Sequence, residues 1–448
     1  MSQREVSAKS EPATQAELQA AMEKYEFGAA WLPIMLLLPP LVYYMWICMT
    51  QNQGSFLVPK SVDELTSLVK LVPAPTLAST LFVSLWLGGQ ALLQVYAPGD
   101  WVEGTPLADG SRLPYKMNGW FSFWLTLLTM FFCCWMGWIP PTFLFDELGP
   151  IISTTTLFCY GLSLYLYLKG KASPDKHMTG RVMYDYFMGS QLNPRVGRFD
   201  FKLFCEARPG LILWVLINFS IAAKQWQLHH TVSTPMMLVC LFQFFYIMDY
   251  FFHEEAILTT WDIKHERFGW MLCFGDLVWV PFTYSLQAQY LLSHPGELPT
   301  WAVLGIIALN LGGYAVFRGT NIQKHHFSRN PDHLIWGKPA KFIRTARGTK
   351  LLASGFWGLA RHLNYCGDLM MALAWCLCAG VSNLLPYFYI IYFTILLIHR
   401  ERRDDALCHA KYGADWEEYR RQVPSRIFPG IYQPSLGRPL LEEAIRGL

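Results

Sequence analysis

The sequence predicts an all-α, polytopic membrane protein with about ten transmembrane helices, and three observations support this. Hydrophobic residues make up 53% of the 448-residue chain and charged residues only 15%, whereas about a quarter of an ordinary soluble domain is charged. Apolar stretches of about 20 residues, the length that crosses a bilayer, recur along the chain. Lysine and arginine gather in a few of the connections between these stretches, as they do in loops that set membrane topology.

The expected helices follow from these apolar stretches in order. The first eight cover residues 28–50, 76–96, 119–139, 151–168, 211–223, 234–252, 269–292 and 300–317. A final apolar stretch at 369–398 is too long for one crossing at about 1.5 Å rise per residue, and it contains Gly380 and Pro386. We therefore expect this stretch to form a tight hairpin of two helices.

Two basic loops predict the orientation of the chain. The loop after the fourth span contains Lys169, Lys171, Lys176, Arg181, Arg195, Arg198, Lys202 and Arg208. The loop after the eighth span contains Arg318, Lys324, Arg329, Lys338, Lys341, Arg344, Arg347 and Lys350. Both loops follow even-numbered spans, so the positive-inside rule places them, the N-terminus and the C-terminal tail in the cytosol.

The chain is expected to form one membrane domain with short polar ends. Residues 1–27 are polar and carry no apolar run, so we expect no cleaved signal peptide; residues 28–398 form the membrane domain and 399–448 a cytosolic tail. The eleven cysteines include no CxxC pair, and several lie in apolar stretches, which favours reduced packing thiols. A net charge of +3 is too small to indicate a nucleic-acid partner.

A polar stripe on the sixth span is the first candidate for chemistry. Tyr246, Asp249, Tyr250 and His253 recur at positions i, i+3, i+4 and i+7, which places them on one helix face. Ionisable residues inside a membrane are costly, so they indicate function by default. The stripe suits a proton donor with an orienting network, and a structural hydrogen-bond cluster near the interface explains the same spacing equally well.

The densest group of polar and aromatic residues lies between the second basic loop and the last apolar stretch. Residues 355–368 read GFWGLARHLNYCGD, a mixture of glycines, an arginine, a histidine and stacking rings that suits a nucleotide with phosphates. An interfacial aromatic belt explains Trp357 and Tyr365 but not the other polar residues. Beyond the last span, Arg400 and Asp404 form an i, i+4 pair if that helix continues, which is also common on solvated helices.

Several classes of site are not supported by the sequence. Neither GxGxxG nor GxxxxGK[ST] occurs, so no Rossmann or P-loop nucleotide site is indicated. A diiron membrane hydroxylase needs clustered histidine motifs, and His325, His326 and His333 do not supply that pattern, so we expect no metal site.

The chain resembles the integral membrane sterol reductases, a family that includes delta-14 and 7-dehydrocholesterol reductases and the reductase-like domain of the lamin B receptor. One signature is YDYFMG at 184–189 with LNPR at 192–195, and the other is the segment 355–368. Similar residues also occur at 261–265, 275–281, 318–324 and in the tail. Residues 367–375 and 380–389 look most like the delta-14 branch, and the 7-dehydrocholesterol branch remains an alternative.

The resemblance implies a fold of about ten helices in which the C-terminal half forms the cofactor pocket, with NADPH as the cofactor. The implied cofactor contacts are Lys324, Arg329, Trp357, Arg361, His362, Asn364, Tyr365, Asp368, Arg400 and Tyr412. The implied catalytic pair is Tyr246 and Asp404, meeting where the sixth span faces the end of the tenth.

The implied reaction saturates a ring double bond, which the delta-14 resemblance makes C14=C15 of a delta-8,14 sterol that enters from the bilayer. Hydride does not add to an unactivated alkene, so an acid first protonates it and leaves a tertiary carbocation. Tyr246 is the expected donor, with Asp404 orienting or recharging it. More distant alternatives are a membrane methyltransferase that uses S-adenosylmethionine and a non-catalytic sterol-binding scaffold. The sequence leaves open the oligomeric state and the host membrane, endoplasmic reticulum or bacterial inner membrane.

Overall fold

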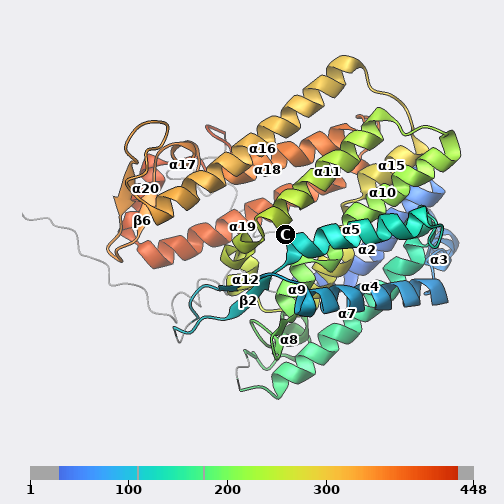
Figure 1. Cartoon of the computed structure of the whole chain (residues 1–448), viewed down its shortest axis with the longest axis horizontal. Helices are drawn as coiled ribbons and strands as arrows, with labels where there is room; N and C mark the ends of the chain where they lie inside the picture. Colours follow the sequence, from blue (N-terminus) through green and yellow to red (C-terminus); the bar gives the residue numbers. More distant parts are fainter. Residues whose placement is uncertain (1–29, 108–109, 175–176, 432–448) are drawn as a thin grey trace, which may run out of the picture. The chain divides into compact units, whose positions relative to one another are not determined.

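The computed structural model describes residues 30–107, 110–174 and 177–431, and within them the chain is mostly helical (Figure 1). The expectation of an all-α fold is confirmed, since the strands of the described residues form only three two-stranded hairpins. These residues divide into two compact units. The N-terminal unit comprises 30–303 and 375–389, and the C-terminal unit comprises 304–374 and 390–431. The polar segment 1–27 and the last residues of the expected tail lie outside the described residues.

The N-terminal unit carries most of the helices. Its α-helices are α2 (Trp31–Gln51), α3 (Val62–Lys70), α4 (Leu77–Tyr96), α5 (Gly119–Trp135), α6 (Phe143–Asp146), α7 (Leu148–Lys171), α8 (Val182–Met188), α9 (Phe201–Ala207), α10 (Pro209–His229), α11 (Thr234–Phe252), α12 (Trp261–His265), α13 (Trp270–Phe274), α14 (Val280–Thr283) and α15 (Leu286–Ser293). Its strands are β1 (Asp100–Glu103), β2 (Pro114–Met117), β3 (Arg195–Val196) and β4 (Phe199–Asp200), and its remaining helical turns are Glu254–Thr259, Gly275–Trp279 and Leu385–Tyr387.

The C-terminal unit is built around three long helices and one hairpin. Its elements are α16 (Thr300–Arg329), β5 (Phe342–Arg344), β6 (Lys350–Leu352), α17 (Phe356–Leu359), α18 (Leu363–Leu377), α19 (Phe388–Tyr412) and α20 (Ala414–Gln422). The strands β5 and β6 pair antiparallel, with Ile343 opposite Leu351. Leu369 of α18, Leu397 of α19 and Ile427 beyond α20 share a buried apolar cluster, which holds the end of the described chain against the two helices.

Helix α10 is the centre of the N-terminal unit, where α4, α6, α9, α11, α14 and α15 pack around it. Pro209 occupies its first turn, where a missing N–H costs no hydrogen bond. Inside the helix, the indole of Trp214 and the amide of Asn218 both donate to Oε1 of Gln243 on α11. The Gln243 amide in turn donates to Gln287 of α15 at 3.3 Å. This buried network fixes three helices in register because each polar group needs its partner in an apolar core.

Six helices of the described residues are long and apolar enough to cross a membrane. They are Trp31–Gln51, Leu77–Tyr96, Leu148–Lys171, Phe201–His229, Thr234–Phe252 and Thr300–Arg329. Gly119–Trp135 and Leu363–Leu377 are apolar but shorter. Six of the predicted spans therefore correspond to membrane-length helices. Of the others, α5 and α18 are shorter, 269–292 is interrupted, and the last span is the apolar start of the long helix α19.

The prediction of one continuous helix at 269–292 is wrong. The chain there forms α13, a π-helical turn at Gly275–Trp279, α14 and then α15 in sequence. Pro281 lacks the N–H that would bond to the carbonyl four residues earlier, which accounts for a widened turn just before it. The apolar stretch at 369–398 divides into α18 and α19, and the break at 378–387 contains Gly380 and Pro386.

Helix α16 runs beside α18 (Figure 1), and a pair of glycines lies at their close contact. A Cβ atom on Gly313 would lie 2.7 Å from the Gly367 carbonyl oxygen, and one on Gly367 would lie 2.5 Å from the Phe317 backbone nitrogen. Real Cβ contacts are not that short, so the two backbones meet only because neither residue has a side chain. This contact places the end of the segment 355–368, at the start of α18, against α16.

We expect Gly313→Ala to destabilise the C-terminal unit by about 1–3 kcal/mol, the usual cost of overpacking. Gly312→Ala is the matched control, because its Cβ would meet only the flexible Met370 side chain at 3.7 Å. That variant should be neutral or gain up to about 1 kcal/mol from helix propensity. Unfolding of the detergent-solubilised variants in an SDS titration measures both. Equal stability of the two would show that the glycine contact is not tight.

Candidate functional site

Polar side chains gather at one end of the C-terminal unit, where four segments meet. These are the last turns of α16, the segment 355–368, the end of α19 and residues 425–426 beyond α20. The Arg361 backbone N–H donates to the Ser425 carbonyl at 3.0 Å, and that of His362 donates to the Arg426 carbonyl at 2.9 Å. Two segments more than sixty residues apart are thus paired through their backbones.

Arg361 lies at the centre of a buried group of charges. Its Nη1 is 3.4 Å from Oδ1 of Asp405, and its Nη2 is 3.7 Å from Oε1 of Glu401. Arg426 contacts the same carboxylates, at 2.9 Å from Glu401 and 3.8 Å from Asp405. The side chains of Arg361 and Glu401 are 1% and 0% exposed. Two arginines and two carboxylates therefore balance each other almost without solvent, and Trp416 covers Arg361 with its ring.

Burial has a direct electrostatic consequence in this group. It raises the pKa of Glu401 above its ordinary value, and the charges of Arg426, His362 and Arg361 only partly offset that effect. It likewise lowers the pKa of Arg361, against the pull of Asp405 and Glu401. Each charge in this group persists because its opposite charges lie beside it.

Asp404 and His362 form the polar face next to this buried group. His362 Nε2 is 3.4 Å from Asp404 Oδ2, and the imidazole stacks on the Tyr365 ring at 4.9 Å with 13° between the planes. Burial works to raise the pKa of Asp404, but the hydrogen bond and charge of His362, together with Lys324, hold it below its usual value. Asp404 is therefore an anion at neutral pH. Helix α19 continues past the apolar stretch to Tyr412, as the predicted Arg400–Asp404 spacing required.

Lys324 and Trp357 form a second pair at this end of the unit. The Lys324 ammonium lies 4.2 Å from the centre of the Trp357 ring, and the indole N–H donates to the Thr320 carbonyl at 2.9 Å. The Phe356 backbone N–H donates to Oε1 of Gln323 at 2.8 Å. These contacts hold the 355–359 turn on α16. Gly355 adopts φ of +63° there, a conformation that side chains disfavour.

The predicted cofactor residues all lie in the C-terminal unit, and several are in direct contact. The contacts join Lys324 to Trp357, His362 to Tyr365 and Asp404, and Tyr412 to Trp416. The exposed Arg329 ends α16, Asn364 and Asp368 lie on the first turns of α18, and Arg400 lies on α19.

The residues at this end fit a phosphorylated nucleotide. Lys324 and Arg329 are exposed cations, and His362 and Tyr365 present stacked rings. Oδ1 of Asn364 is buried and makes no hydrogen bond within the described residues. Buried polar atoms ordinarily have partners, so water or a ligand is the expected complement. Among the described residues, no group of three or more His, Cys, Asp or Glu is placed to hold a metal ion.

Tyr246 lies in the N-terminal unit, so its surroundings are described separately. The centre of its ring lies 6.4 Å from that of Trp214 and 5.2 Å from that of Trp375. It meets the Trp375 ring edge-on. It follows Gln243 by one turn on α11, so the buried amide network fixes its position. His253 Nδ1 lies 3.4 Å from Oδ1 of Asp249, which confirms that these two members of the predicted stripe are neighbours.

Sequence reasoning missed Glu401, Asp405, Arg426 and Trp416. A signal existed for the first two, since they lie four residues apart in the charged stretch 399–405 and so share a face of α19. Nothing in the spacing indicates that this face meets Arg361, forty residues earlier. Arg426 and Trp416 were uninformative members of a polar tail. The phosphate contact predicted for Arg361 stays a prediction.

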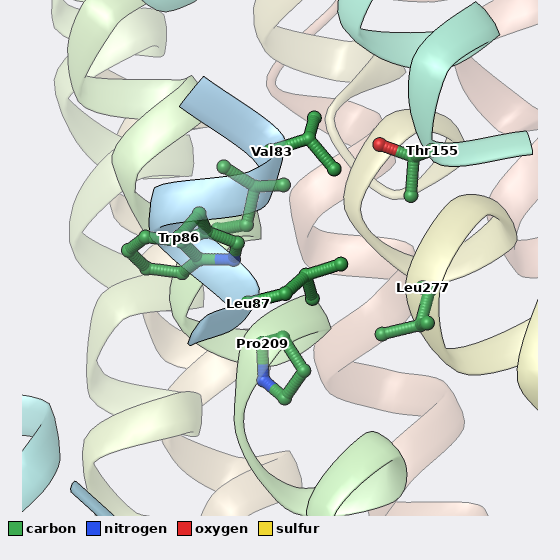
Figure 2. A pocket seen from close by; sticks show the side chains of 7 residues that line it. Val83, Trp86, Leu87, Thr155, Pro209 and Leu277 are labelled. Atoms are coloured by element: carbon green, nitrogen blue, oxygen red, sulfur yellow. The ribbon is translucent and has the colours of Figure 1, made fainter. Parts of the chain in front are cut away.

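A small cavity in the N-terminal unit is too small for a lipid or cofactor. Figure 2 shows Val83, Trp86 and Leu87 of α4 converging with Thr155, Pro209 and Leu277 around it. Its volume of about 10 Å³ is close to the least that holds a single water molecule. This cavity is therefore a packing defect among apolar helices and not a substrate site.

Comparison with known proteins gives a family match across most of the chain. Residues 21–432 match the model described as "Ergosterol biosynthesis ERG4/ERG24 family". The "Delta(14)-sterol reductase" of Methylotuvimicrobium alcaliphilum is 56% identical over 418 residues, which cover 93% of this chain and 98% of that protein. The protein of the same name from Dictyostelium discoideum is 44% identical, covering 93% and 94%. "Delta(14)-sterol reductase TM7SF2" of Mus musculus is 44% identical, covering 92% and 99%.

We expect Arg361→Met to destabilise the protein by about 3–5 kcal/mol, because removing one partner leaves carboxylates buried without their counter-charge. Arg421→Met is the matched control, since Arg421 is 67% exposed and pairs with Glu418 at the surface. Surface pairs contribute about 0–1 kcal/mol. Unfolding free energies in mixed micelles measure both variants. Equal losses would contradict the structural importance of the buried group.

Proposed function

This chain belongs to the ergosterol biosynthesis ERG4/ERG24 family, and on that premise we propose that it reduces the C14=C15 double bond of a delta-8,14 sterol with NADPH. The observation that carries the proposal is the identity of 44–56% to three delta-14-sterol reductases over at least nine-tenths of this chain. The protein is thus an oxidoreductase that acts on a carbon–carbon double bond of a sterol. The alternative is reduction of the delta-7 double bond, as in the 7-dehydrocholesterol reductases.

The polar end of the C-terminal unit supports NADPH as the reductant. Lys324 and Arg329 are exposed where the cofactor's phosphates would be held, and the 2′-phosphate distinguishes NADPH from NADH. The stacked His362 and Tyr365 present a flat face for a ring, and Asn364 offers a buried acceptor without a hydrogen bond. When bound, NADPH would supply the hydride that completes the reduction.

Arg361 is better suited to positioning than to phosphate binding. Its charge is already matched by Asp405 and Glu401, and it is almost fully buried. Through its backbone and the neighbouring His362 it fixes the segment that carries the half-buried His362, Asn364 and Tyr365.

Tyr246 is the proposed proton donor because a phenol hydroxyl is a hydrogen-bond donor that can pass a proton to the alkene. Protonation of the alkene leaves a tertiary carbocation, which water would capture if it had access. The Trp214 and Trp375 rings beside the half-buried Tyr246 are themselves buried, so they shield part of its ring from water. Asp404 is the second proposed catalytic residue, and because it is an anion at neutral pH it can accept a hydrogen bond but holds no proton to give.

We also propose about ten membrane crossings, with both termini in the cytosol. The six membrane-length helices would be joined by α5, the interrupted stretch α13–α15, α18 and α19. The basic residues that follow α7 and α16 favour the cytosolic side for these connections. The sterol would then enter from the bilayer and the water-soluble cofactor from the cytosol.

A substrate comparison tests the proposed function. The purified protein with NADPH should convert a delta-8,14 sterol, seen as loss of the conjugated-diene absorbance and as a product two mass units heavier. A 5,7-diene sterol supplied in parallel should react far more slowly. Turnover of the 5,7-diene alone would assign the chain to the delta-7 branch, and turnover of neither, with sterol still bound, would favour a scaffold.

We expect Tyr246→Phe to lower turnover by about 10²–10⁴-fold, the usual contribution of a general acid. Its NADPH affinity should stay within twofold of the parent protein, because the ring and its aromatic contacts remain. Tyr165→Phe is the matched control, since Tyr165 is 47% exposed on α7, and its activity should not change. Turnover of Tyr246→Phe at the parent rate would remove Tyr246 as the donor.

A further inference from the structure

The N-terminal unit contains a second cavity that the proposed reaction does not use. Its volume is about 310 Å³, at the lower end of the range for small-molecule sites. It lies between the end of α4, the β1–β2 hairpin, the β3–β4 hairpin and the start of α9. The lining residues are Gln94, Val95, Tyr96, Trp101, Pro114, Tyr115, Lys116, Val196, Arg198, Phe199, Asp200 and Leu203.

The inner wall of this cavity is held by specific contacts. Tyr115 and Leu203 are 4% and 1% exposed and belong to one buried cluster. The Arg195 guanidinium lies 4.5 Å from the centre of the Tyr115 ring and donates to the Pro114 carbonyl at 2.8 Å. These contacts tie the two hairpins together, so the cavity is part of the fold and not a gap between loops.

The cavity carries an excess of positive charge. Among the described residues, Asp200 is the only carboxylate that lines it, and this group is 2.7 Å from Nε of Arg195 and also accepts a hydrogen bond from the Leu203 backbone. Burial, with the nearby Asp200, raises the pKa of Tyr115 to about 12, so its phenol adds no negative charge. Lys116 and Arg198 are therefore not neutralised by the lining residues. The Arg198 guanidinium is held over the Trp101 ring at 5.4 Å.

On the proposed ten-crossing topology, the cavity lies at a membrane surface. It lies where α4, an apolar helix long enough to span a bilayer, ends at Tyr96 and where the apolar α5 begins. Tyr96 and Trp101 at its rim are 77% and 46% exposed, and such aromatic residues are enriched at the level of lipid headgroups. Lys116 donates to the Val95 carbonyl at 2.8 Å, which keeps its charge at the end of α4.

We propose that this cavity binds the phosphate-bearing headgroup of an anionic phospholipid. The phosphate would lie against Arg198 and Lys116, and the glycerol would lie against Trp101 and Tyr96, with the acyl chains continuing into the bilayer beside α4. A free phosphate ion offers the same charge but leaves the aromatic rim and most of the volume unfilled. The proposal is independent of the sterol reaction and assigns the N-terminal unit a lipid site of its own.

Lipid retention on the full-length protein tests the proposal. The protein in neutral detergent is titrated with short-chain phosphatidylglycerol or phosphatidylcholine, and bound lipid is counted by native mass spectrometry. Phosphatidylglycerol should bind in a one-to-one complex more tightly than phosphatidylcholine. Arg198→Ala should weaken it about fivefold, the usual effect of one basic residue at an anionic surface. Arg198→Lys should retain most of the binding.

Lys171→Ala is the matched control, because Lys171 is exposed at the end of α7 and does not line the cavity. It should bind phosphatidylglycerol like the parent protein. Equal binding of the two lipids, or equal losses in Arg198→Ala and Lys171→Ala, would overturn the proposal. Displacement of phosphatidylglycerol by an equal concentration of inorganic phosphate would also overturn it, since the site would then recognise a free anion.

Discussion

The buried pairing of Arg361 with Glu401 and Asp405 is the interaction on which the C-terminal unit depends. It joins the segment 355–368 to α19, and Arg426 extends it to the end of the described chain. Charges without solvent are stable only while every partner is present. The arrangement therefore fixes three separate stretches of sequence relative to one another: 355–368, α19 and the residues after α20. The neighbouring side chains His362 and Asp404 are positioned by the same contacts.

This buried group also positions the residues of the candidate site. His362 follows Arg361 directly, pairs with Asp404 and stacks on Tyr365, so the position of the guanidinium decides where these rings lie. On the other side, the close approach of Gly313 to Gly367 places α18 against α16, whose last turns carry Lys324. In the N-terminal unit, the hydrogen bonds of Gln243 hold α11 against α10 and α15, and this fixes the position of Tyr246 one turn later on α11. In both units, buried polar contacts fix the residues proposed for chemistry.

The helical fold and six of its membrane-length helices could be predicted from hydrophobic length, because a bilayer sets the length of an apolar helix that crosses it. The same reasoning failed at 269–292, where the apolar length was right but Pro281 and the π-helical turn interrupt the helix. Candidate site residues were found through a resemblance and through dense local motifs. Glu401 and Arg426 were missed because their importance arises from a tertiary contact with Arg361, and no spacing within either segment encodes a partner that distant. The aromatic surroundings of Tyr246 were missed for the same reason, since Trp375 comes from the chain after α16.

Cofactor choice is the most direct test of this account. Binding of NADPH, NADH and S-adenosylmethionine to the purified protein is measured separately by quenching of tryptophan fluorescence, with calorimetry as a second readout. The account predicts saturable NADPH binding at least about tenfold tighter than NADH, since losing one charge-assisted phosphate contact costs about 1.5–3 kcal/mol. Saturable binding of S-adenosylmethionine without binding of NADPH would contradict it.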